Sequence, residues 1–533
     1  MKFATIDYIV FAAYAGLILF IALWVSRDKG GKEKNSEDYF LASKALPWWA
    51  IGTSLIASNI SAEQFIGMSG SGFRLGLAIA SYEWMAAITL IIVAWFFLPI
   101  YLKKGIYTMP QFLEQRYDNR VRTVLAIFWL LVFVFVNLTS VLHLGALAME
   151  TIMGVNYWYA LIGLGVFAMV YSIYGGLKAV ALTDVVQVTF LIGGGLLTTF
   201  LALDSFGGDA GALAGFKKLL NEVPEYFSMI LEPGEITYQD GGETVDAYSL
   251  LPGLSVLIGG MWIANLFYWG CNQYIIQRAL AAKSLKEARL GVAFAGFLKL
   301  LLPLIVVIPG ITAFAMDAPI ETADAAYPWL LGKYIGPGLK GLAFAALVAA
   351  VVSSLASMMN STATIFTMDI YRHYLRPGAS EKELVRTGRL TALAAMVIAG
   401  LVAFPLLGAT DQVFQYIQEY TGFVSPGVLA IFIMGLFWKK ATPNAALLSA
   451  VLSIPLSIFI AEIAPNMPFM NRIGSVFLIS LGVIIAVSLI EAKGQDHPKG
   501  IELEKSLFKA DGLFMVLAFA IGAITAVLYT IFW

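Results

Sequence analysis

Residues 51–70 read IGTSLIASNISAEQFIGMSG, an apolar segment with a polar centre. A helix of about 20 such residues crosses about 30 Å of hydrocarbon. The polar side chains at mid-depth belong to Ser58, Asn59, Ser61, Glu63 and Gln64. Each unpaired polar group in hydrocarbon costs several kcal/mol, so the pattern predicts a crossing whose backbone unwinds and lines a cavity. The alternative is a continuous helix that is buried among neighbours and packs through its small residues.

The composition places this segment in a membrane protein. Of 533 residues, 59% are hydrophobic and 13% are charged, with a mean hydropathy of +0.80; a soluble domain carries about twice that charged fraction. One cysteine and three histidines exclude a disulfide framework and a His/Cys metal site. A net charge of −1 without a basic patch excludes nucleic-acid binding. We expect an all-α polytopic membrane protein, because such long apolar runs also exclude a barrel.

Apolar runs bounded by charge, Pro or Gly predict 14 spans. They lie at 6–25, 47–71, 75–102, 123–151, 157–176, 181–204, 250–276, 290–316, 341–370, 390–408, 411–437, 443–463, 473–491 and 513–533. Loops after odd-numbered spans hold 26 of the 34 Lys and Arg residues, and the opposite side holds 7. Because positive charge marks the cytoplasmic side, both termini are expected outside. The chain, 1–533, reads as one transmembrane domain, and short helices are expected in its long outside loop, about 205–249.

The seventh span has the same character as residues 51–70. Gly259 and Gly260 weaken its helix. The polar and aromatic residues that follow are Asn265, Tyr268, Trp269, Asn272 and Gln273. Two interrupted spans that are five apart in order have opposite orientations, which is typical of an inverted five-plus-five repeat with two discontinuous helices.

Further polar groups lie at depth. The ninth span carries hydroxyls at Ser353, Ser354, Ser357 and Ser361. These can coordinate a hard cation, or they can serve helix packing alone. The ionisable residues inside spans are Glu83, Asp184, Lys299 and Glu419. Each is costly unless it is paired or faces water, so a functional role competes with a structural Glu–Lys pair and, for Asp184, with helix capping.

Five stretches resemble the sodium:solute symporter family, and within it the bacterial sodium/galactose symporters. They are SAEQFIGMSGSG at 61–72, ASYEWM at 80–85, VYSIYGGL at 170–177, GCNQYIIQR at 270–278 and FQYIQEYTG at 414–422. The likeness covers nearly the whole chain. It implies a LeuT-like fold with an extra helix at 6–25, a first inverted repeat at 47–204, a second at 250–437 and three C-terminal helices at 443–533.

The resemblance also implies a sugar site at the membrane midplane. The residues that match its sugar contacts are Gln64, Glu83, Asn265, Lys299 and Gln418, with Tyr268 stacked on the ring next to Trp269. Tyr268 is also the expected inner gate. The expected outer gate is Met68, Tyr82 and Phe414.

Sodium is the co-transported ion that the resemblance implies. Its matched ligands are the carbonyls of Ala57, Ile60 and Ala350 and the hydroxyls of Ser353 and Ser354. Five hard oxygens without a carboxylate suit a monovalent cation better than a divalent one. Asp184 matches an acidic residue near the cytoplasmic sodium exit.

The polar residues agree with a sugar as the substrate. A pyranose donates and accepts through its hydroxyls and has an apolar face, so it needs carboxylate and amide partners and an aromatic platform. Two positions depart from the galactose symporters: Ala86 replaces a serine that contacts the sugar, and Phe133 replaces a tyrosine. One hydrogen bond is worth about 0.5–1.5 kcal/mol, so these departures bear on the preferred epimer.

These observations predict a sodium-coupled symporter of a monosaccharide, galactose or glucose, that works by alternating access in the inner cell membrane. It is not expected to be an enzyme, because no nucleophile–base or metal constellation is present. The alternatives are a symporter of the same fold for inositol, sialic acid or an amino acid, and an uncoupled sugar-binding channel or sensor. The expected partners are the sugar and the lipid bilayer. The sequence does not fix the oligomeric state.

Overall fold

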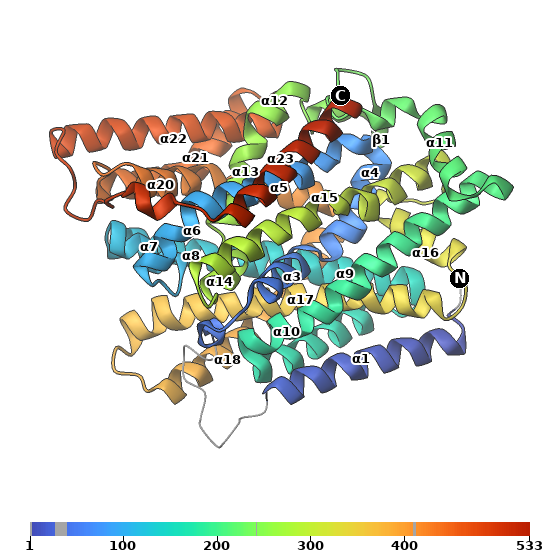
Figure 1. The fold of residues 1–533 in the computed structure, drawn as a ribbon, viewed down its shortest axis with the longest axis horizontal. Coiled ribbons are helices and arrows are strands. Elements are labelled where there is room, and N and C mark those ends of the chain that lie inside the picture. Colours follow the sequence, from blue (N-terminus) through green and yellow to red (C-terminus); the bar gives the residue numbers. More distant parts are fainter. Residues whose placement is uncertain (1–2, 27–39, 241, 409–411) are drawn as a thin grey trace.

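The computed structural model describes residues 3–26, 40–240, 242–408 and 412–533. Helices make up most of these ranges and run mainly along the long axis of the molecule (Figure 1). Within the described ranges, 9 helices are long and apolar enough to cross a membrane, or up to 11 if each bent pair is one span. The expectation of an all-α, multi-span chain is confirmed at this level, and the number 14 stays a prediction. Five basic residues used in the orientation count lie outside the described ranges: Lys2, Arg27, Lys29, Lys32 and Lys34.

The first half of the chain forms α1 to α11. The long helices and the segments that continue them are α1 (Thr5–Ser26), α3 (Trp48–Asn59), η2 (Glu63–Met68), α4 (Ser69–Leu75), α5 (Ser81–Ile92), η4 (Val93–Phe97), α6 (Leu98–Lys104), α7 (Met109–Arg116), α8 (Asn119–Leu131), η5 (Val132–Leu138), α9 (Thr139–Met153), α10 (Tyr157–Gly207) and α11 (Gly211–Glu222). Short 3₁₀ turns are η1 (Ala42–Lys44), η3 (Gly76–Ala80), η6 (Gly208–Ala210) and η7 (Pro224–Phe227). With 51 residues, α10 is longer than one crossing requires and covers both predicted spans 157–176 and 181–204.

The second half forms β1 to α23. Its elements are β1 (Thr237–Asp240), β2 (Glu243–Asp246), α12 (Gly253–Ile258), α13 (Gly260–Gly270), α14 (Gln273–Leu280), α15 (Leu285–Ala315), α16 (Ala326–Tyr334), α17 (Leu339–Ile365), η10 (Phe366–Leu375), α18 (Glu381–Leu407), α19 (Val413–Gly422), α20 (Ser425–Phe437), α21 (Pro443–Ile463), α22 (Phe469–Ala492) and α23 (Gly512–Ile531). Short 3₁₀ turns are η8 (Ala247–Ser249), η9 (Ala323–Ala325) and η11 (Lys505–Phe508).

The predicted unwinding at residues 51–70 is confirmed. The helix α3 ends at Asn59, and Ile60 has an extended backbone with φ −76° and ψ 94°. After Ser61 and Ala62, the chain resumes as the π-helical turn η2 and continues into α4. Short π-helical segments are frequent at functional sites. The break therefore exposes backbone and polar side chains halfway along the span.

The seventh span is broken at the predicted glycines and once more beyond them. The helices before and after Gly259 are bent by 77°, and α13 is separated from α14 by Cys271 and Asn272. One expectation needs correction, because a further span is discontinuous: α19 and α20, predicted as one span at 411–437, meet at 50°. The physical reason is Pro426 in the first turn of α20, since the ring of proline cannot continue a helix through that position.

The long loop between α10 and α12 carries more than the expected short helices. Beyond α11, the strands β1 and β2 pair antiparallel, with Thr237 opposite Asp246. Gly242 supports the turn with φ +90°, which a residue with a Cβ rarely adopts. From this hairpin, the Tyr238 hydroxyl accepts a hydrogen bond of 3.0 Å from Nε2 of Gln412, just before α19.

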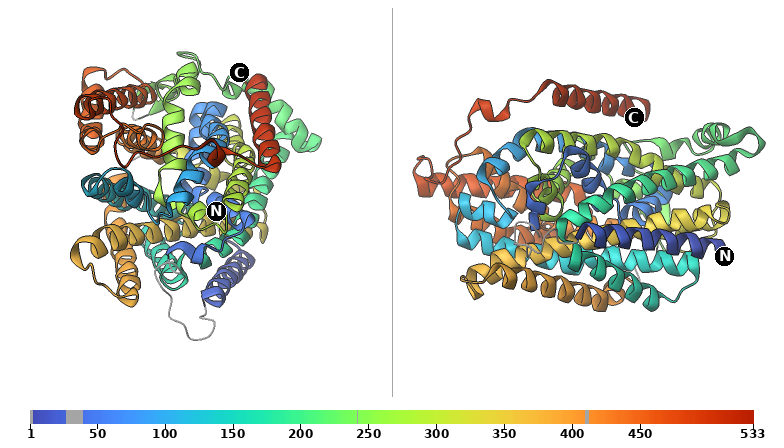
Figure 2. Two further views of the ribbon diagram at one scale, coloured as in Figure 1. Left: turned by 60° about the vertical axis from the view of Figure 1, so that its left-hand side comes forward. Right: turned by 60° about the horizontal axis from the view of Figure 1, so that its bottom comes forward.

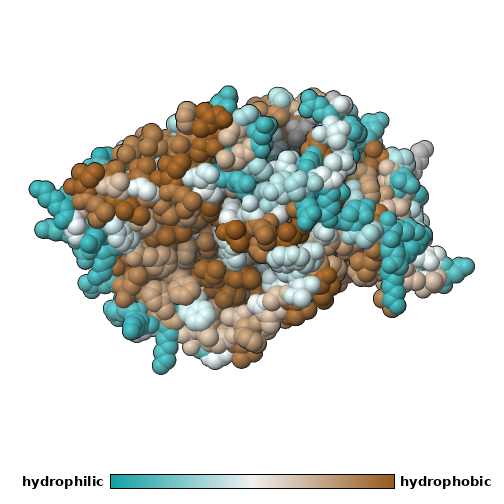
Figure 3. Space-filling model, turned by 90° about the horizontal axis from the view of Figure 1, so that it is seen from above, coloured by the Kyte–Doolittle hydropathy of each residue, from teal (hydrophilic) through white to brown (hydrophobic). Residues whose placement is uncertain are grey.

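The core is built around α15 and α17. The helix α15 packs against α3, α4 and α5, and α17 packs against α10 and α18. Three helices, α21, α22 and α23, lie toward the outside of the bundle (Figures 1 and 2). A broad hydrophobic surface lies between hydrophilic ends in Figure 3. The first broken span, α3 to α4, is thus buried against the continuous helix α15.

Candidate functional site

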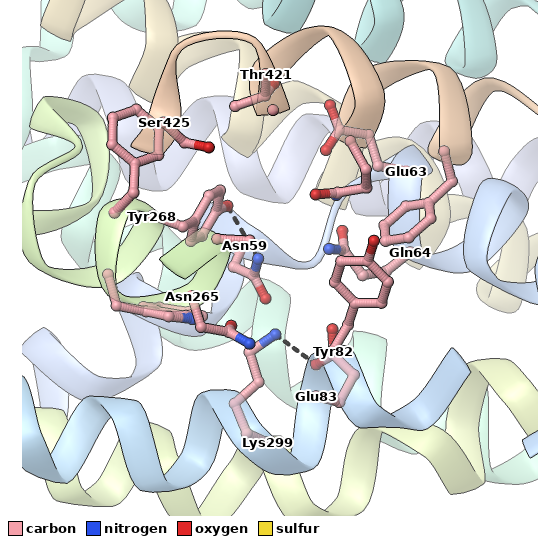
Figure 4. Close-up of a pocket in the computed structure, with 16 residues that line it drawn as sticks. Asn59, Glu63, Gln64, Tyr82, Glu83, Asn265, Tyr268, Lys299, Thr421 and Ser425 are labelled. Atoms are coloured by element: carbon pink, nitrogen blue, oxygen red, sulfur yellow. Dashed lines mark hydrogen bonds and ion pairs between the residues drawn. The ribbon is translucent and has the colours of Figure 1, made fainter. Parts of the chain in front are cut away.

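A cavity lies where the broken helices meet α5 and α15 (Figure 4). Its walls come from the break after α3, from α5, α13 and α15, and from the bend between α19 and α20. The lining residues are Asn59, Glu63, Gln64, Tyr82, Glu83, Ala264, Asn265, Phe267, Tyr268, Trp269, Lys299, Phe414, Gln418, Thr421, Gly422 and Ser425. The cavity is therefore enclosed by residues from segments far apart in the sequence.

The seven residues predicted to bind substrate all line this one cavity. They are Gln64, Glu83, Asn265, Lys299, Gln418, Tyr268 and Trp269. Three of them illustrate how the elements position the site: Gln64 is the second residue of the π-helical turn after the break, Glu83 lies in the first turn of α5, and Lys299 lies within α15. The two positions that depart from the galactose symporters, Ala86 and Phe133, are buried and do not line the cavity.

The Glu83 carboxylate and the Lys299 ammonium form a buried ion pair on one wall (Figure 4). The two side chains are 3% and 1% exposed, so each charge depends on the other for compensation. The Lys299 ammonium also lies 5.1 Å from the centre of the Trp269 ring. This wall presents a fixed donor and a fixed acceptor beside an aromatic surface.

Six buried polar atoms of the cavity wall have no hydrogen-bond partner among the described residues. They are Asn59 Oδ1, Glu63 Oε1, Tyr82 Oη, Asn265 Nδ2, Thr421 Oγ1 and Ser425 Oγ. An unsatisfied buried polar group costs about 1–3 kcal/mol, and buried polar groups in proteins are rarely left unpaired. The set includes donors and acceptors on several walls. It therefore suits a ligand that carries many hydroxyl groups.

Aromatic side chains close the cavity on two sides. Tyr82 and Phe414 meet edge to face at 5.2 Å, and Tyr268 meets Trp269 at 5.1 Å. Asn59 donates a hydrogen bond of 2.9 Å to the Tyr268 hydroxyl (Figure 4). A Cβ on Gly67 would lie 2.9 Å from Cβ of Phe414, so only glycine permits this approach. Tyr82 and Phe414 of the predicted outer gate thus contact each other, and Tyr268, the predicted inner gate, lies beside Trp269 in the cavity wall.

Met68, the third predicted outer-gate residue, does not line the cavity. It is completely buried at the end of η2, next to Gly67. Its chain neighbour Gly67 lies close to Phe414. The structure thus brings Tyr82 and Phe414 together at the cavity, and Met68 is not among the residues that line it.

The residues predicted to bind sodium lie where the end of α3 meets α17. Ala57 and Ile60 are at the last turn of α3, and Ala350, Ser353 and Ser354 are buried in α17. The Ser354 hydroxyl donates a hydrogen bond of 3.1 Å to the Ser58 carbonyl, which joins the two helices. These five residues would bind an ion through carbonyl and hydroxyl oxygens alone. Such a set of oxygen ligands fits a hard monovalent cation.

Asp184 lies beside these residues and is completely buried in α10. Its carboxylate accepts a hydrogen bond of 2.5 Å from the Ser54 hydroxyl and another from the Ser353 hydroxyl. Asp184 therefore contacts both helices of the predicted sodium site. It does not act as a helix cap, because α10 continues far beyond it on both sides.

Sequence reasoning placed Asn59 and Glu63 in the broken span but not in the site, and it missed Thr421, Ser425 and Arg278. The signal for Thr421 and Ser425 is the proline after Ser425, which marks a break with polar residues on both sides. Arg278 could have been found from its position, because it is a positively charged residue a few positions after the break in the seventh span. The completely buried Arg278 side chain reaches Ser54, Ser357 and Asp184.

Two solved structures share the fold. A sodium-coupled sialic acid symporter matches with a TM-score of 0.77 at 21% identity, over 92% of this chain and 98% of that one. Mhp1, a nucleobase-cation-symport-1 family transporter, matches with a TM-score of 0.55 at 13% identity, over 89% of this chain and 98% of that one. At these identities the likeness concerns the fold alone.

Curated relatives cover most of the chain. A sodium/glucose cotransporter of Vibrio parahaemolyticus is 53% identical over 99% of this chain and 98% of its own length. Human sodium/myo-inositol cotransporter 2 is 34% identical over 83% of this chain and 67% of its own length. Rat sodium/glucose cotransporter 2 is 34% identical over 83% of this chain and 69% of its own length.

The family model described as "Sodium:solute symporter family" matches residues 39–453. The resemblance drawn from the five motifs is thereby confirmed. So are the predictions that the chain is a symporter, that it is not an enzyme and that sodium is its coupling ion. The chain belongs to the sodium:solute symporter family.

Proposed function

We propose that the protein carries a monosaccharide, galactose or glucose, into the cell together with sodium. The observation that supports this most is the cavity with six unpartnered polar atoms beside the Glu83–Lys299 pair and the Tyr268–Trp269 surface. A pyranose has both features that this cavity complements, several hydroxyls and an apolar face. The name of the Vibrio relative, a sodium/glucose cotransporter, agrees with this substrate class.

The sugar is bound by hydrogen bonds from polar residues on opposite walls. In this proposal Gln64, Glu83, Asn265, Lys299 and Gln418 contact the hydroxyls, and Tyr268 stacks on the ring next to Trp269. Lys299 donates while its charge stays balanced by Glu83, so no uncompensated charge is created when the sugar leaves. Glu63, which the sequence did not assign to the site, adds an acceptor to the same cavity.

Transport proceeds by alternating access around this cavity. Tyr82 and Phe414, backed by Met68, form the outer gate, and Tyr268, held by Asn59, forms the inner gate. Sodium binds to Ala57, Ile60, Ala350, Ser353 and Ser354, and Asp184 lies on its exit route. Coupling is the difference between the affinities of the two conformations for sodium and sugar.

We further propose the full topology for this transport cycle. The chain crosses the inner cell membrane 14 times with both termini outside, as the distribution of Lys and Arg indicates. The inverted repeats are 47–204 and 250–437. They are preceded by the helix at 6–25 and followed by the three helices at 443–533. The lipid bilayer is then the partner of the apolar outer surface.

Labelled galactose uptake into proteoliposomes tests the proposal. With an inward sodium gradient, we expect galactose to accumulate above its external concentration, and with potassium in place of sodium we expect no accumulation. Failure of galactose and glucose to enter under both gradients, with folded protein, would refute sugar symport.

A second candidate substrate is a cyclic polyol such as inositol. It is favoured by the 34% identity to human sodium/myo-inositol cotransporter 2 and by the same hydroxyl-binding cavity. The same liposomes decide between the two, because unlabelled inositol should displace labelled galactose poorly if a hexose is the preferred substrate. Stronger displacement by inositol than by glucose would reverse the assignment.

A further inference from the structure

A completely buried arginine, Arg278, lies in α14 just after the break that follows the inner-gate tyrosine. Its Nε donates to the Ser54 hydroxyl at 2.8 Å and to the Ser54 carbonyl at 3.0 Å. One terminal nitrogen donates to the Ser357 hydroxyl and lies 3.9 Å from Oδ2 of Asp184. A single side chain therefore joins α14 to α3, α10 and α17.

The partners of Arg278 are also the neighbours of the proposed sodium ligands. Ser353 donates to the same Asp184 carboxylate, and the Ser357 hydroxyl donates to the Ser353 carbonyl at 2.7 Å. The Ser357 hydroxyl also lies 3.1 Å from the Ser58 hydroxyl, at the end of α3. Any change in the spacing of α3 and α17 must therefore change the surroundings of the guanidinium.

The other end of α14 reaches the proposed inner gate. The remaining terminal nitrogen of Arg278 donates to the carbonyl of Tyr274, one helical turn earlier. The Tyr274 hydroxyl donates to the Tyr268 hydroxyl at 2.5 Å, and the two rings meet at 5.8 Å and 88°. Hydrogen bonds through Ser54 and Arg278 thus connect Asp184 with the Tyr274 carbonyl, and the hydroxyl of the same tyrosine bonds to Tyr268.

We propose that Arg278 is the positioning residue that transmits sodium occupancy to the inner gate, an inference that rests on the proposed function. Sodium held between α3 and α17 keeps Ser54, Ser357 and Asp184 at the spacing that the guanidinium spans. Loss of sodium lets α3 and α17 separate. Arg278 then loses its hydrogen-bond acceptors, and α14 loses the contact that Arg278 makes with these helices. Tyr268 then leaves the position in which Tyr274 and Asn59 hold it.

The geometry requires arginine rather than any cation. The guanidinium presents several N–H donors in a rigid planar fork, whereas the lysine ammonium is a point charge on a flexible stem. Arg278→Lys keeps the charge beside Asp184 and loses the simultaneous bridge to Ser54, Ser357 and the Tyr274 carbonyl. This substitution separates bridging from charge compensation.

The accessibility of the native cysteine can report movement of α14. Cys271 is the only cysteine of the chain, is completely buried and lies between α13 and α14. We would measure the rate at which a methanethiosulfonate reagent modifies Cys271 in the full-length protein in nanodiscs, in sodium and in choline. We expect sodium to slow the wild-type reaction by about fivefold or more and to have less than about a twofold effect in Arg278→Lys.

Two matched controls separate coupling from packing. Arg116 is a buried arginine that donates to the carbonyls of Gly435 and Trp438, far from α14 in the sequence, and Arg116→Lys should keep the wild-type sodium effect. Ser357→Ala removes one acceptor of Arg278 and should weaken the sodium effect even if Arg278→Lys fails to fold. Ser361→Ala, one turn further along α17, removes a hydroxyl that donates to Gln277 at 2.9 Å and should leave the effect intact.

Three results would overturn the inference. The first is a Cys271 rate that is insensitive to sodium in the wild type, and the second is a wild-type sodium effect in both Arg278→Lys and Ser357→Ala. The third is an equal loss of the effect in the controls. The assay needs no sugar, so sodium protection of Cys271 without galactose uptake would refute the proposed substrate and leave the role of Arg278 in place.

Discussion

The cavity and the network around Asp184 are both buried and polar, but their hydrogen bonding differs. In the cavity, six polar side-chain atoms lack partners among the described residues. Around Asp184, both carboxylate oxygens accept hydroxyl hydrogen bonds and a guanidinium lies beside them. One region is open to new hydrogen bonds, and the other is already satisfied by the protein.

This difference indicates how each region works. A site that must take up and release a ligand with many hydroxyls benefits from groups that the protein leaves unpaired, because the ligand completes them. A region that must report the presence of a small ion benefits from a fixed arrangement that changes only when helices move. Substitutions in the cavity should therefore act on sugar affinity, and substitutions around Asp184 should act on sodium dependence.

The largest effect is expected for Lys299→Ala in the cavity. Removing the ammonium leaves Glu83 buried without its counter-ion, and truncating one partner of such a pair costs about 2–5 kcal/mol. We expect galactose uptake to fall about 100-fold or more, measured in proteoliposomes with equal amounts of folded protein. The double variant Glu83→Gln with Lys299→Gln removes both charges as a control. It should recover thermal stability but not uptake, and full recovery of uptake would reduce the pair to a structural role.

A smaller effect is expected for Ser354→Ala at the other region. The substitution removes one hydroxyl from the proposed sodium ligands and should raise the sodium concentration for half-maximal uptake by about three- to tenfold. Ser449→Ala is the matched control, because Ser449 is buried in α21 and is neither a lining residue of the cavity nor a proposed sodium ligand. If the two variants show the same sodium dependence as the wild type, Ser354 does not belong to the ion site.

The smallest effect is expected for Ala86→Ser, which adds a hydroxyl to α5 three residues after Glu83, at a buried position that does not itself line the cavity. We expect galactose affinity to rise about threefold relative to glucose, since one neutral hydrogen bond is worth about 0.5–1.5 kcal/mol. Competition of unlabelled galactose and glucose for uptake measures this ratio. Ala87→Ser adds the same hydroxyl at the next position and should leave the ratio unchanged. An unchanged ratio in both variants would show that position 86 does not choose the epimer.

The sequence was most informative where polar residues interrupt apolar runs. Unpaired polar groups are costly inside a membrane. The polar residues between Asn59 and Gln64 therefore indicated a break in the helix, and the ionisable residues Glu83 and Lys299 indicated a possible ion pair. The structure has both the break and the pair. The two glycines of the seventh span marked its bend for a similar reason, because glycine weakens a helix.

Other features depend on contacts that no local pattern contains. The bend at Pro426 was missed because a proline near the start of a helix is common and does not by itself identify a break. The role of Arg278 depends on Ser54, Asp184 and Ser357, which come from three separate helices. The burial of Met68 outside the cavity lining depends on how the neighbouring helices pack around η2. Such relations arise only from tertiary packing.

The hairpin of β1 and β2 is connected by a hydrogen bond to the segment that leads into the proposed outer gate. Tyr238 in β1 accepts a hydrogen bond from Gln412, which precedes the proposed gate residue Phe414 by two positions. An antibody fragment raised against the hairpin and selected in the presence of sodium would therefore hold α19 in one position without entering the cavity. Such a binder would make the hairpin an epitope for trapping a single conformation of the transporter.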